Sequence, residues 1–232
     1  MGNQDCRFCN TRLNSIFRDL NPEEAEKLNE IKICNNYKKG SYIFVEGASP
    51  NGLFCVNNGK VKIIQTGVDG KEQIIHFANN GDVLGYRAIL SGDTYSCSAI
   101  TMEDSSLCYI PKSFFMQMVE SNSKLTLRIF MFFSDMLKDS EKKITNIAQR
   151  SVKERLAQSI LLLKESYGFE ADGRTINLSI TREEMANIAG TTRETAIRIL
   201  SDLQNENAIE LNGKKISISN LQLLIKVANV FD

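Results

Sequence analysis

Two arginines and a glutamate in the last third of the chain have the types and spacing to read the edges of DNA bases. Arg193, Glu194 and Arg198 fall within two turns of a segment with helical spacing. A guanidinium can donate two hydrogen bonds to O6 and N7 of guanine, and a carboxylate can accept one from N4 of cytosine. Glu194 can also brace Arg198 from the i, i+4 position. These side chains predict contact with nucleic acid.

The segment that must position them has the pattern of two short helices joined by a tight turn. Thr181 and Glu184 form a capping box that starts the first helix. Gly190 supplies the turn, and Thr191 or Thr192 caps a second helix that runs to about residue 205. The expected buried stripes are Met185, Ile188 and Ala189, then Ala196, Ile199, Leu200 and Leu203. A helix-turn-helix of this kind places its second helix in the major groove.

A hairpin over 209–218, turning at Asn212-Gly213, follows the second helix and is expected to form a wing. Lys214 and Lys215 lie at its tip, where ammonium groups can contact phosphates. Ile197 cannot donate a hydrogen bond but can contact a thymine methyl group. The full set of expected DNA contacts is Thr181, Arg182, Thr191, Thr192, Arg193, Glu194, Ile197, Arg198 and Lys214.

Cysteine is the other residue type that could do chemistry. The chain has six cysteines, and its first residues contain no apolar signal core, so we expect a cytoplasmic, reducing location. There cysteines are thiols, ligands or sensors more often than structural disulfides. Inert packing is the alternative, in which Cys55, Cys97 and Cys108 are small buried strand residues. A thiol–disulfide switch is the other alternative.

Composition limits the classes of protein. The 232 residues suffice for two domains, and 28 basic against 28 acidic residues give zero formal net charge. A protein that binds polyanions by bulk charge alone is therefore excluded, although a local basic face is not. No apolar run approaches the ~18 residues of a membrane helix, so we expect no membrane contact.

The order of elements predicts an α+β protein. Residues 1–20 form a Cys-containing leader, and short β-rich runs between glycines over 21–111 indicate an all-β sandwich or barrel. A helix over 112–148 carries two apolar stripes and is expected to pair with its copy in a homodimer. Two core helices with a break near Asn122 or Asp139 are the alternative. Residues 149–232 hold the winged helix-turn-helix.

The whole layout resembles the cyclic-AMP receptor protein and fumarate–nitrate reduction regulator (Crp/Fnr) superfamily. The resemblance rests on the β-roll glycines, Gly81-Asp82-Val83-Leu84-Gly85, the long helix, Val152-Lys153-Glu154-Arg155-Leu156 and Thr192-Arg193-Glu194-Thr195-Ala196-Ile197-Arg198. It implies a homodimer that reads a palindromic TGTGA-like site, contacts RNA polymerase and responds to an effector at the β-roll. Arg193, Glu194 and Arg198 would read the bases.

The effector is not identified by the resemblance. The cyclic-nucleotide branch has Glu after the glycine at Gly85 and an Arg-Ser pair that holds the phosphate. This chain has Tyr86 after Gly85 and Tyr95-Ser96 at the second place, with Arg87 displaced by one residue. Without this arginine, a bound phosphate would have no charge-assisted hydrogen-bond partner at that place, which argues against cyclic AMP as the effector. The expected effector pocket is still Gly85, Tyr86, Arg87, Tyr95 and Ser96.

The fumarate–nitrate branch suggests another sensor, an iron–sulfur cluster. Cys6, Cys9 and Cys108 match three of its four cysteine ligands, but the remaining position is Ser15. Clusters prefer four thiolates, so Asp5 or Cys34 would have to replace the missing ligand.

We expect a transcription regulator and no enzyme. An enzyme on a β-roll would need a set of histidine and glutamate metal ligands, and His76 is the only histidine. A β-roll regulatory protein without specific DNA binding is the alternative, and the intact Arg193, Glu194 and Arg198 set argues against it.

Overall fold

The computed structural model describes residues 5–67 and 70–229. Its contacts divide the chain into two compact units, 1–138 and 139–232. The division falls inside helix α5 (Ser123–Gln149), so this helix belongs in part to each unit. None of the helices in the described ranges has the length and apolar character needed to cross a membrane.

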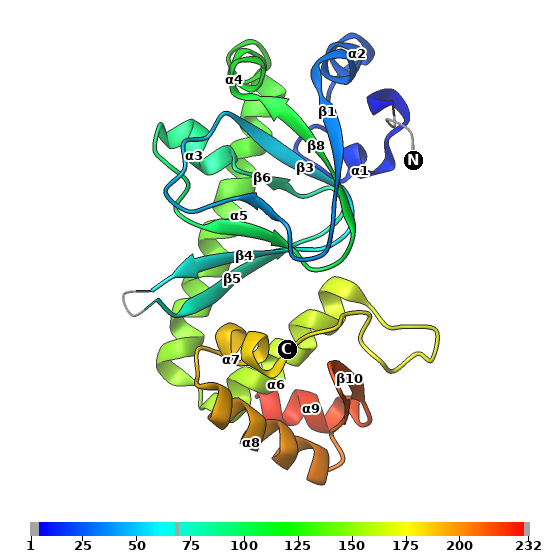
Figure 1. The fold of residues 1–232 in the computed structure, drawn as a ribbon, viewed down its shortest axis with the longest axis vertical. Helices are drawn as coiled ribbons and strands as arrows, with labels where there is room; N and C mark the ends of the chain where they lie inside the picture. The colour runs from blue at the N-terminus through cyan, green and yellow to red at the C-terminus, as the bar shows by residue number, and fades with distance from the viewer. Residues whose placement is uncertain (1–4, 68–69, 230–232) are drawn as a thin grey trace. The chain divides into compact units, whose positions relative to one another are not determined.

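The first unit is a β-roll covered by helices (Figure 1). Its elements are η1 (Cys6–Phe8), α1 (Asn10–Leu13), α2 (Pro22–Ile31), β1 (Ile33–Tyr37), β2 (Tyr42–Phe44), β3 (Gly52–Asn58), β4 (Val61–Thr66), β5 (Glu72–Ala78), β6 (Val83–Leu84), α3 (Tyr86–Ser91), β7 (Ser98–Thr101), β8 (Ser105–Pro111), α4 (Lys112–Ser121) and the start of α5. The strands form two antiparallel sheets, β1-β8-β3-β6 and β2-β7-β4-β5. The predicted α+β class with an N-terminal β-roll is confirmed.

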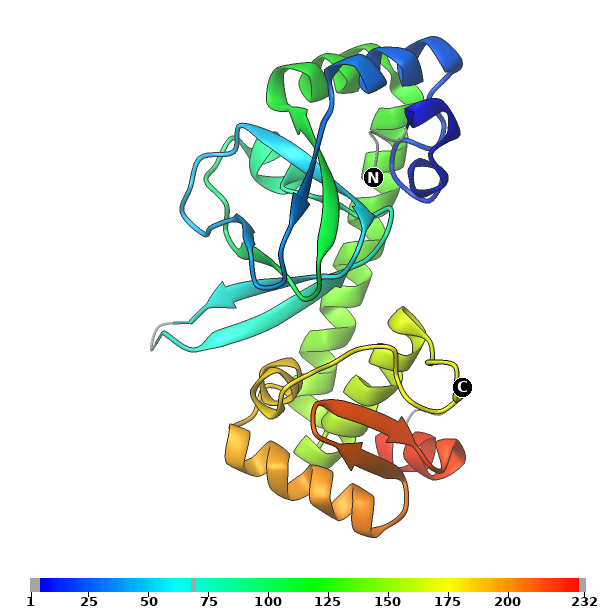
Figure 2. The ribbon, with the colours of Figure 1, turned by 45° about the vertical axis from the view of Figure 1, so that its right-hand side comes forward.

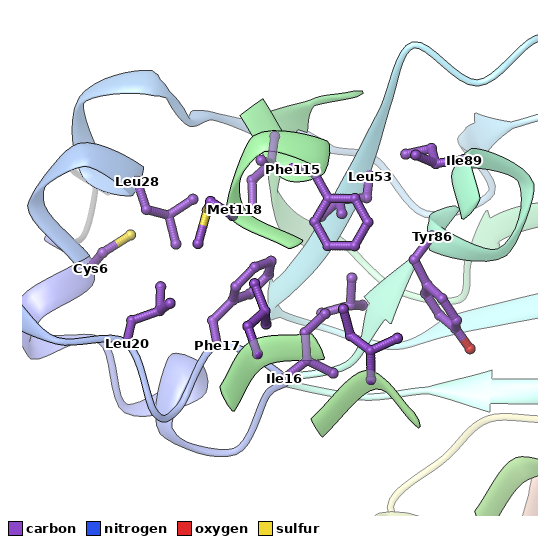
Figure 3. Close-up of a cluster of buried hydrophobic side chains, with 14 residues drawn as sticks. Cys6, Ile16, Phe17, Leu20, Leu28, Leu53, Tyr86, Ile89, Phe115 and Met118 are labelled. Atoms are coloured by element: carbon purple, nitrogen blue, oxygen red, sulfur yellow. The ribbon is translucent and has the colours of Figure 1, made fainter. Parts of the chain in front are cut away.

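Alternating side chains of the first sheet serve two separate cores, as the two-residue period of a strand requires. Val56 and Leu107 face the second sheet and pack with Val61 and Ala99. The outer face packs instead against the leader and helices α2, α4 and α5 (Figure 3). This outer core contains Cys6, Ile16, Phe17, Leu20, Leu28, Leu53, Val83, Tyr86, Ile89, Ile110, Phe115, Met118, Leu125 and Ile129.

The prediction of one continuous helix over 112–148 is wrong, because the helix is broken at Asn122, one of the two places that the alternative named. Asn122 has extended backbone angles between α4 and α5. Its side-chain oxygen accepts a hydrogen bond from the backbone N–H of Leu125 at 2.9 Å, which caps α5. The helix then continues without a break at Asp139.

The second unit holds the end of α5, α6 (Val152–Tyr167), α7 (Arg182–Ala189), α8 (Arg193–Asn205), β9 (Ile209–Asn212), β10 (Lys215–Ile218) and α9 (Leu221–Ala228). Figure 2 shows the β9–β10 hairpin following the end of α8. Fully buried side chains from α6, α7, α8, α9 and the hairpin form its core, among them Leu156, Ile160, Met185, Leu200, Ile209, Ile216 and Leu224.

Candidate functional site

Helix α7 and its turn form as the sequence predicts. The Thr181 hydroxyl accepts a hydrogen bond from the Glu184 N–H at 3.1 Å, and the Glu184 carboxylate accepts one from the Thr181 N–H at 2.9 Å. Gly190 ends the helix in the left-handed conformation with φ of 62°, which suits a residue without a Cβ. The buried stripe contains Met185, Ala186 and Ala189, whereas Ile188 is only partly buried.

Helix α8 presents the predicted base-reading side chains to solvent. Thr192, rather than Thr191, is its N-cap and accepts from the Thr195 N–H at 3.3 Å. Ala196, Ile199, Leu200 and Leu203 are buried as expected. The opposite face exposes Arg193, Glu194, Ile197 and Arg198.

These exposed ends are available to a ligand. Among the described residues, none donates to, accepts from or forms an ion pair with the side chains of Arg193, Glu194 and Arg198. The expected brace between Glu194 and Arg198 is therefore not formed in this structure. Unpaired guanidinium groups on a helix face keep all their donors free for an external acceptor.

Arg155 on α6 is a residue whose role the sequence reasoning missed. Its guanidinium donates to the carbonyl oxygens of Ala189 at 2.8 Å and Gly190 at 3.3 Å, and also to that of Arg150 at 2.8 Å. It thereby gives hydrogen-bond partners to carbonyls at the C-terminal end of α7. Its positive charge also interacts favourably with the negative end of the helix dipole there. The motif Val152–Leu156 had marked the residue, but nothing local indicated its partner.

The hairpin also forms as predicted, with Gly213 at a φ of 56° in the turn. Lys214 is exposed, whereas Lys215 forms an ion pair with Glu170 and is only partly exposed. Thr181, Arg182 and Thr191 are also partly buried. The Nη1 atom of Arg182 is shielded from solvent without a hydrogen-bond partner among the described residues, and burial lowers the pKa of Arg182.

All five residues of the expected effector pocket line one cavity of the first unit. It has an empty volume of about 640 Å³ including its open mouth, and Gly85, Tyr86, Arg87, Tyr95 and Ser96 border it. Most of the remaining wall is apolar: Phe44, Ile63, Ile75, Val83, Leu84, Ala88, Phe132 and Met136, with His76, Asp82 and Cys97 as the other polar members.

The two tyrosines of this cavity are held in place by the protein. The Tyr95 ring stacks on Phe44 with centroids 4.1 Å apart, its hydroxyl donates to the Gly52 carbonyl at 3.1 Å, and burial raises its pKa to about 12. The Tyr86 hydroxyl donates to the sulfur of Met136 on α5 at 2.7 Å. A ligand in this cavity would therefore contact both the β-roll and α5. Arg87 also borders the cavity, but its side chain is exposed to solvent.

A second cavity of the first unit, about 400 Å³ in empty volume, gathers cysteines from distant parts of the chain. Cys6 and Cys9 of the leader, Cys55 of β3 and Cys108 of β8 all border it. Cys108 is bonded to Cys34 of β1 in a disulfide across 74 residues. Of the roles left open for Cys108, this structure therefore has the disulfide, and its partner is Cys34.

The residues present do not fit a four-thiolate iron–sulfur cluster. Cys108 is held in the disulfide, and Ser15 is a structural hydroxyl that donates to the Arg12 carbonyl at 2.7 Å and accepts from the Phe17 N–H at 3.1 Å. Within residues 5–67 and 70–229, no group of three His, Cys, Asp or Glu side chains is placed to hold a metal ion. Cys6 and Cys9 remain free thiols.

Helix α5 carries large apolar side chains that the chain itself leaves uncovered. Phe130 is 67% exposed, and the others are Leu127, Met131, Leu137, Ile144 and Ile147. Leu125 and Ile129 of the same helix are instead buried in the outer core. Exposed apolar surface of this extent on one element marks an interaction site.

Comparison with known proteins agrees with both units. The family model described as a cyclic nucleotide-binding domain matches residues 34–122, and the Crp-like helix-turn-helix domain matches residues 154–227. The anaerobic regulatory protein of Pasteurella multocida is 30% identical over 227 residues, which cover 96% of this chain and 82% of the relative. The fumarate and nitrate reduction regulatory protein of Vibrio cholerae is 29% identical and covers 97% of this chain and 90% of its own length.

Solved structures share the fold at lower identity. A transcriptional regulator of the Crp/Fnr family from Thermus thermophilus superposes with a TM-score of 0.72 at 22% identity and covers 85% of this chain and 99% of its own. The c-di-GMP-responsive global regulator of Xanthomonas campestris has a TM-score of 0.74 at 21% identity and covers 86% of this chain and 100% of its own.

Proposed function

The chain belongs to the Crp/Fnr family of transcription regulators, and on that premise we propose that it binds a palindromic TGTGA-like DNA site as a homodimer under the control of a signal at the β-roll. The observation that carries the proposal is the exposed, unpaired face of α8 with Arg193, Glu194 and Arg198 at its N-terminal half. We further propose that the protein works in the cytoplasm, where its DNA lies, and that it contacts RNA polymerase.

Base reading is assigned to the first two turns of α8. The N-terminal end of a recognition helix approaches the base edges most closely. Arg193 and Arg198 each offer a planar fork of donors that fits the two acceptors of guanine, and Glu194 fits the amino group of cytosine. Ile197, which is 40% exposed, offers an apolar contact to a thymine methyl group. Together these side chains can specify a short half-site.

Phosphate contacts fix the register of the helix in the groove. Lys214 at the hairpin tip is the best-placed cation, because Lys215 is held by Glu170. Thr181, Arg182, Thr191 and Thr192 surround the N-terminal ends of α7 and α8, where free backbone N–H groups favour anions.

Dimerisation is supported by the uncovered apolar residues of α5. Each copy would bury Leu127, Phe130 and Met131 against its partner, and a twofold axis would then present two α8 helices to one face of DNA. Half-sites would lie about one helical turn, ~34 Å, apart.

We propose that the 640 Å³ cavity takes a small, largely apolar effector rather than cyclic AMP. Its wall is apolar, and the place expected for a phosphate-binding arginine holds Tyr95, whose hydroxyl is engaged by Gly52. A buried phosphate without a charge-assisted partner would lose its solvation without compensation. Addition of cyclic AMP is therefore expected to leave DNA binding unchanged, and stronger binding in its presence would contradict this assignment.

The DNA proposal is tested by fluorescence anisotropy with a labelled TGTGA palindrome and a scrambled duplex of the same composition. We expect at least a thousandfold preference for the palindrome at physiological salt. Arg198→Ala should cost about 1–3 kcal/mol on the palindrome and relax preference at one base pair. Arg18→Ala removes an exposed arginine from the first unit and serves as the charge-matched control. Equal binding to both duplexes would leave only a regulatory protein without specific DNA binding.

A further inference from the structure

Three cysteines lie side by side across the first sheet. Cys34 of β1 is directly opposite Cys108 of β8, and Cys108 is directly opposite Cys55 of β3. Residues opposite each other in an antiparallel ladder point to the same face. This cysteine row (Cys34, Cys108 and Cys55) therefore lies on one face, with the disulfide joining its first two members.

The face of the row is the outer one, where the leader covers the sheet. Cys108 borders the 400 Å³ cavity together with Cys6, Cys9 and Cys55. Two cations border the same cavity, Arg12 and Lys32, and Lys32 is only 5% exposed. Lys32 partly offsets the effect of burial, which raises the pKa of the Cys6 thiol. Breaking the disulfide would thus add a fourth thiol to a cavity that contains three thiols and two cations.

We infer that the Cys34–Cys108 disulfide is a reversible redox site that modulates the DNA binding proposed above, on which this inference rests. A dithiol of the thioredoxin or dithiothreitol class supplies the electrons. We place the attack of the reductant at Cys34, because this residue is partly exposed whereas Cys108 is buried.

The exchange is a two-electron, two-proton step. A thiolate of the dithiol attacks Sγ of Cys34 and forms a mixed disulfide, while Sγ of Cys108 leaves with the electron pair of the old S–S bond and takes up a proton. The second thiol of the reductant then closes on its own mixed-disulfide sulfur and releases the Cys34 thiol. The reductant ends as a disulfide, and both protein cysteines end as thiols. An oxidised dithiol reverses the sequence.

The leader and α2 connect this site to helix α5 within the first unit. Cys34 is the second residue of β1, which follows α2 after a single residue. The leader's Asp19 forms an ion pair with Arg128 of α5 at 2.5 Å, and Glu24 of α2 accepts from the side chain of Asn122 at 2.8 Å. Figure 3 shows Cys6, Phe17 and Leu28 in the outer core. Breaking the covalent link between β1 and β8 therefore changes a support of the helix that carries the exposed apolar residues.

The thiol chemistry is tested first on the full chain and needs no DNA. The protein is equilibrated in glutathione buffers of graded potential, alkylated with one reagent, reduced, alkylated with a second reagent and mapped by mass spectrometry. We expect two thiols per chain to convert together, at Cys34 and Cys108, with a midpoint inside the range of these buffers. A bond that stays closed throughout while the protein remains folded would identify a structural disulfide and overturn the inference, as would iron bound at these cysteines.

The effect of the disulfide on DNA binding is tested by measuring the affinity of the oxidised and the reduced protein for the palindrome. Oxidised and reduced protein should differ in Kd by at least about fivefold, the lower end of common allosteric couplings. Cys34→Ser and Cys108→Ser should each fix the affinity of the reduced form and abolish its response to potential. Ser49→Ala, a change at an exposed loop residue that borders neither cavity, should keep the response.

The outcomes separate the two proposals. Specific binding of equal strength by both forms of the parent protein would overturn the redox inference and leave the proposed function intact. Loss of preference for the palindrome in both forms would instead overturn the proposed function, and the thiol mapping would stand alone. Because the parent protein is compared in both states, the test does not depend on either serine variant folding.

Discussion

Arg155 connects helix α6 to the end of helix α7, and Arg155→Met tests whether this contact holds the helix-turn-helix in place. Methionine keeps most of the apolar stem and removes the guanidinium. Three hydrogen bonds to backbone carbonyls are lost, two of them at 2.8 Å and one, partly exposed, at 3.3 Å. A bond from a charged donor contributes roughly 1.5–3 kcal/mol when buried, and less when exposed.

We therefore expect Arg155→Met to lower the free energy of unfolding of the second unit by about 3 kcal/mol. For a unit of 60–100 residues, each kcal/mol shifts Tm by about 4–8 °C, so the transition should fall by roughly 12–24 °C. Calorimetry of the full chain measures this shift. Because the carbonyls of Ala189 and Gly190 lie in the turn before α8, DNA affinity should also fall while the base preference stays the same.

The matched control is Arg198→Ala, which removes an exposed arginine without partners among the described residues and should leave Tm within about 2 °C. If Arg155→Met melts as close to the parent as this control does, the contact does not stabilise the turn. A variant that keeps its stability but changes its preferred base would also refute the reasoning, because Arg155 would then act on DNA directly.

Three further predictions concern dimerisation, phosphate contact and acid stability. Phe130→Asp places a charge in the uncovered apolar surface of α5 and should raise the dimer dissociation constant at least tenfold in analytical ultracentrifugation. Lys214→Ala should weaken binding to all DNA sequences alike and reduce the slope of log K against log salt by about one in anisotropy titrations. Between pH 4 and pH 2, the Tm of Asp172→Asn should fall by less than the Tm of the parent protein in thermal unfolding. The Thr175 hydroxyl and nearby N–H groups hold the pKa of Asp172 at about 2, so its stabilising effect is present above its unfolded pKa and is lost as pH falls through the folded value.

Each of these has a contrary outcome. Lys124→Asp, at another exposed position of α5, should leave dimerisation unchanged, and equal loss in both variants would point to helix damage. A Lys214→Ala protein with altered base preference would contradict a phosphate role. Identical acid unfolding of Asp172→Asn and the parent would contradict the role of that carboxylate.

Local patterns were enough to predict the helix-turn-helix. The capping box of Thr181 and Glu184, the turn at Gly190 and the buried stripe of α8 depend on residues at most a few positions apart. The same holds for the hairpin after α8. Hydrogen-bond geometry and helical or strand periodicity act over these short separations, so the sequence alone determines them.

Contacts between distant segments were decided only by the tertiary structure. The sequence marked Cys6, Cys9 and Cys108 as a group, but strand register put Cys34 and Cys55 on either side of Cys108. A shift of one residue in β1 would have turned Cys34 to the other face, and no local signal sets that register.

The contacts at the end of α7 and at the break between α4 and α5 also join distant segments of the chain. Arg155 reaches carbonyls 34 and 35 residues away, and Asn122 meets Glu24 across 98 residues. The sequence by itself determined the two helices of the helix-turn-helix, the hairpin after them and the side chains that α8 exposes. Packing decided which sulfurs, carbonyls and carboxylates meet, because those partners are chosen by the three-dimensional arrangement of whole sheets and helices.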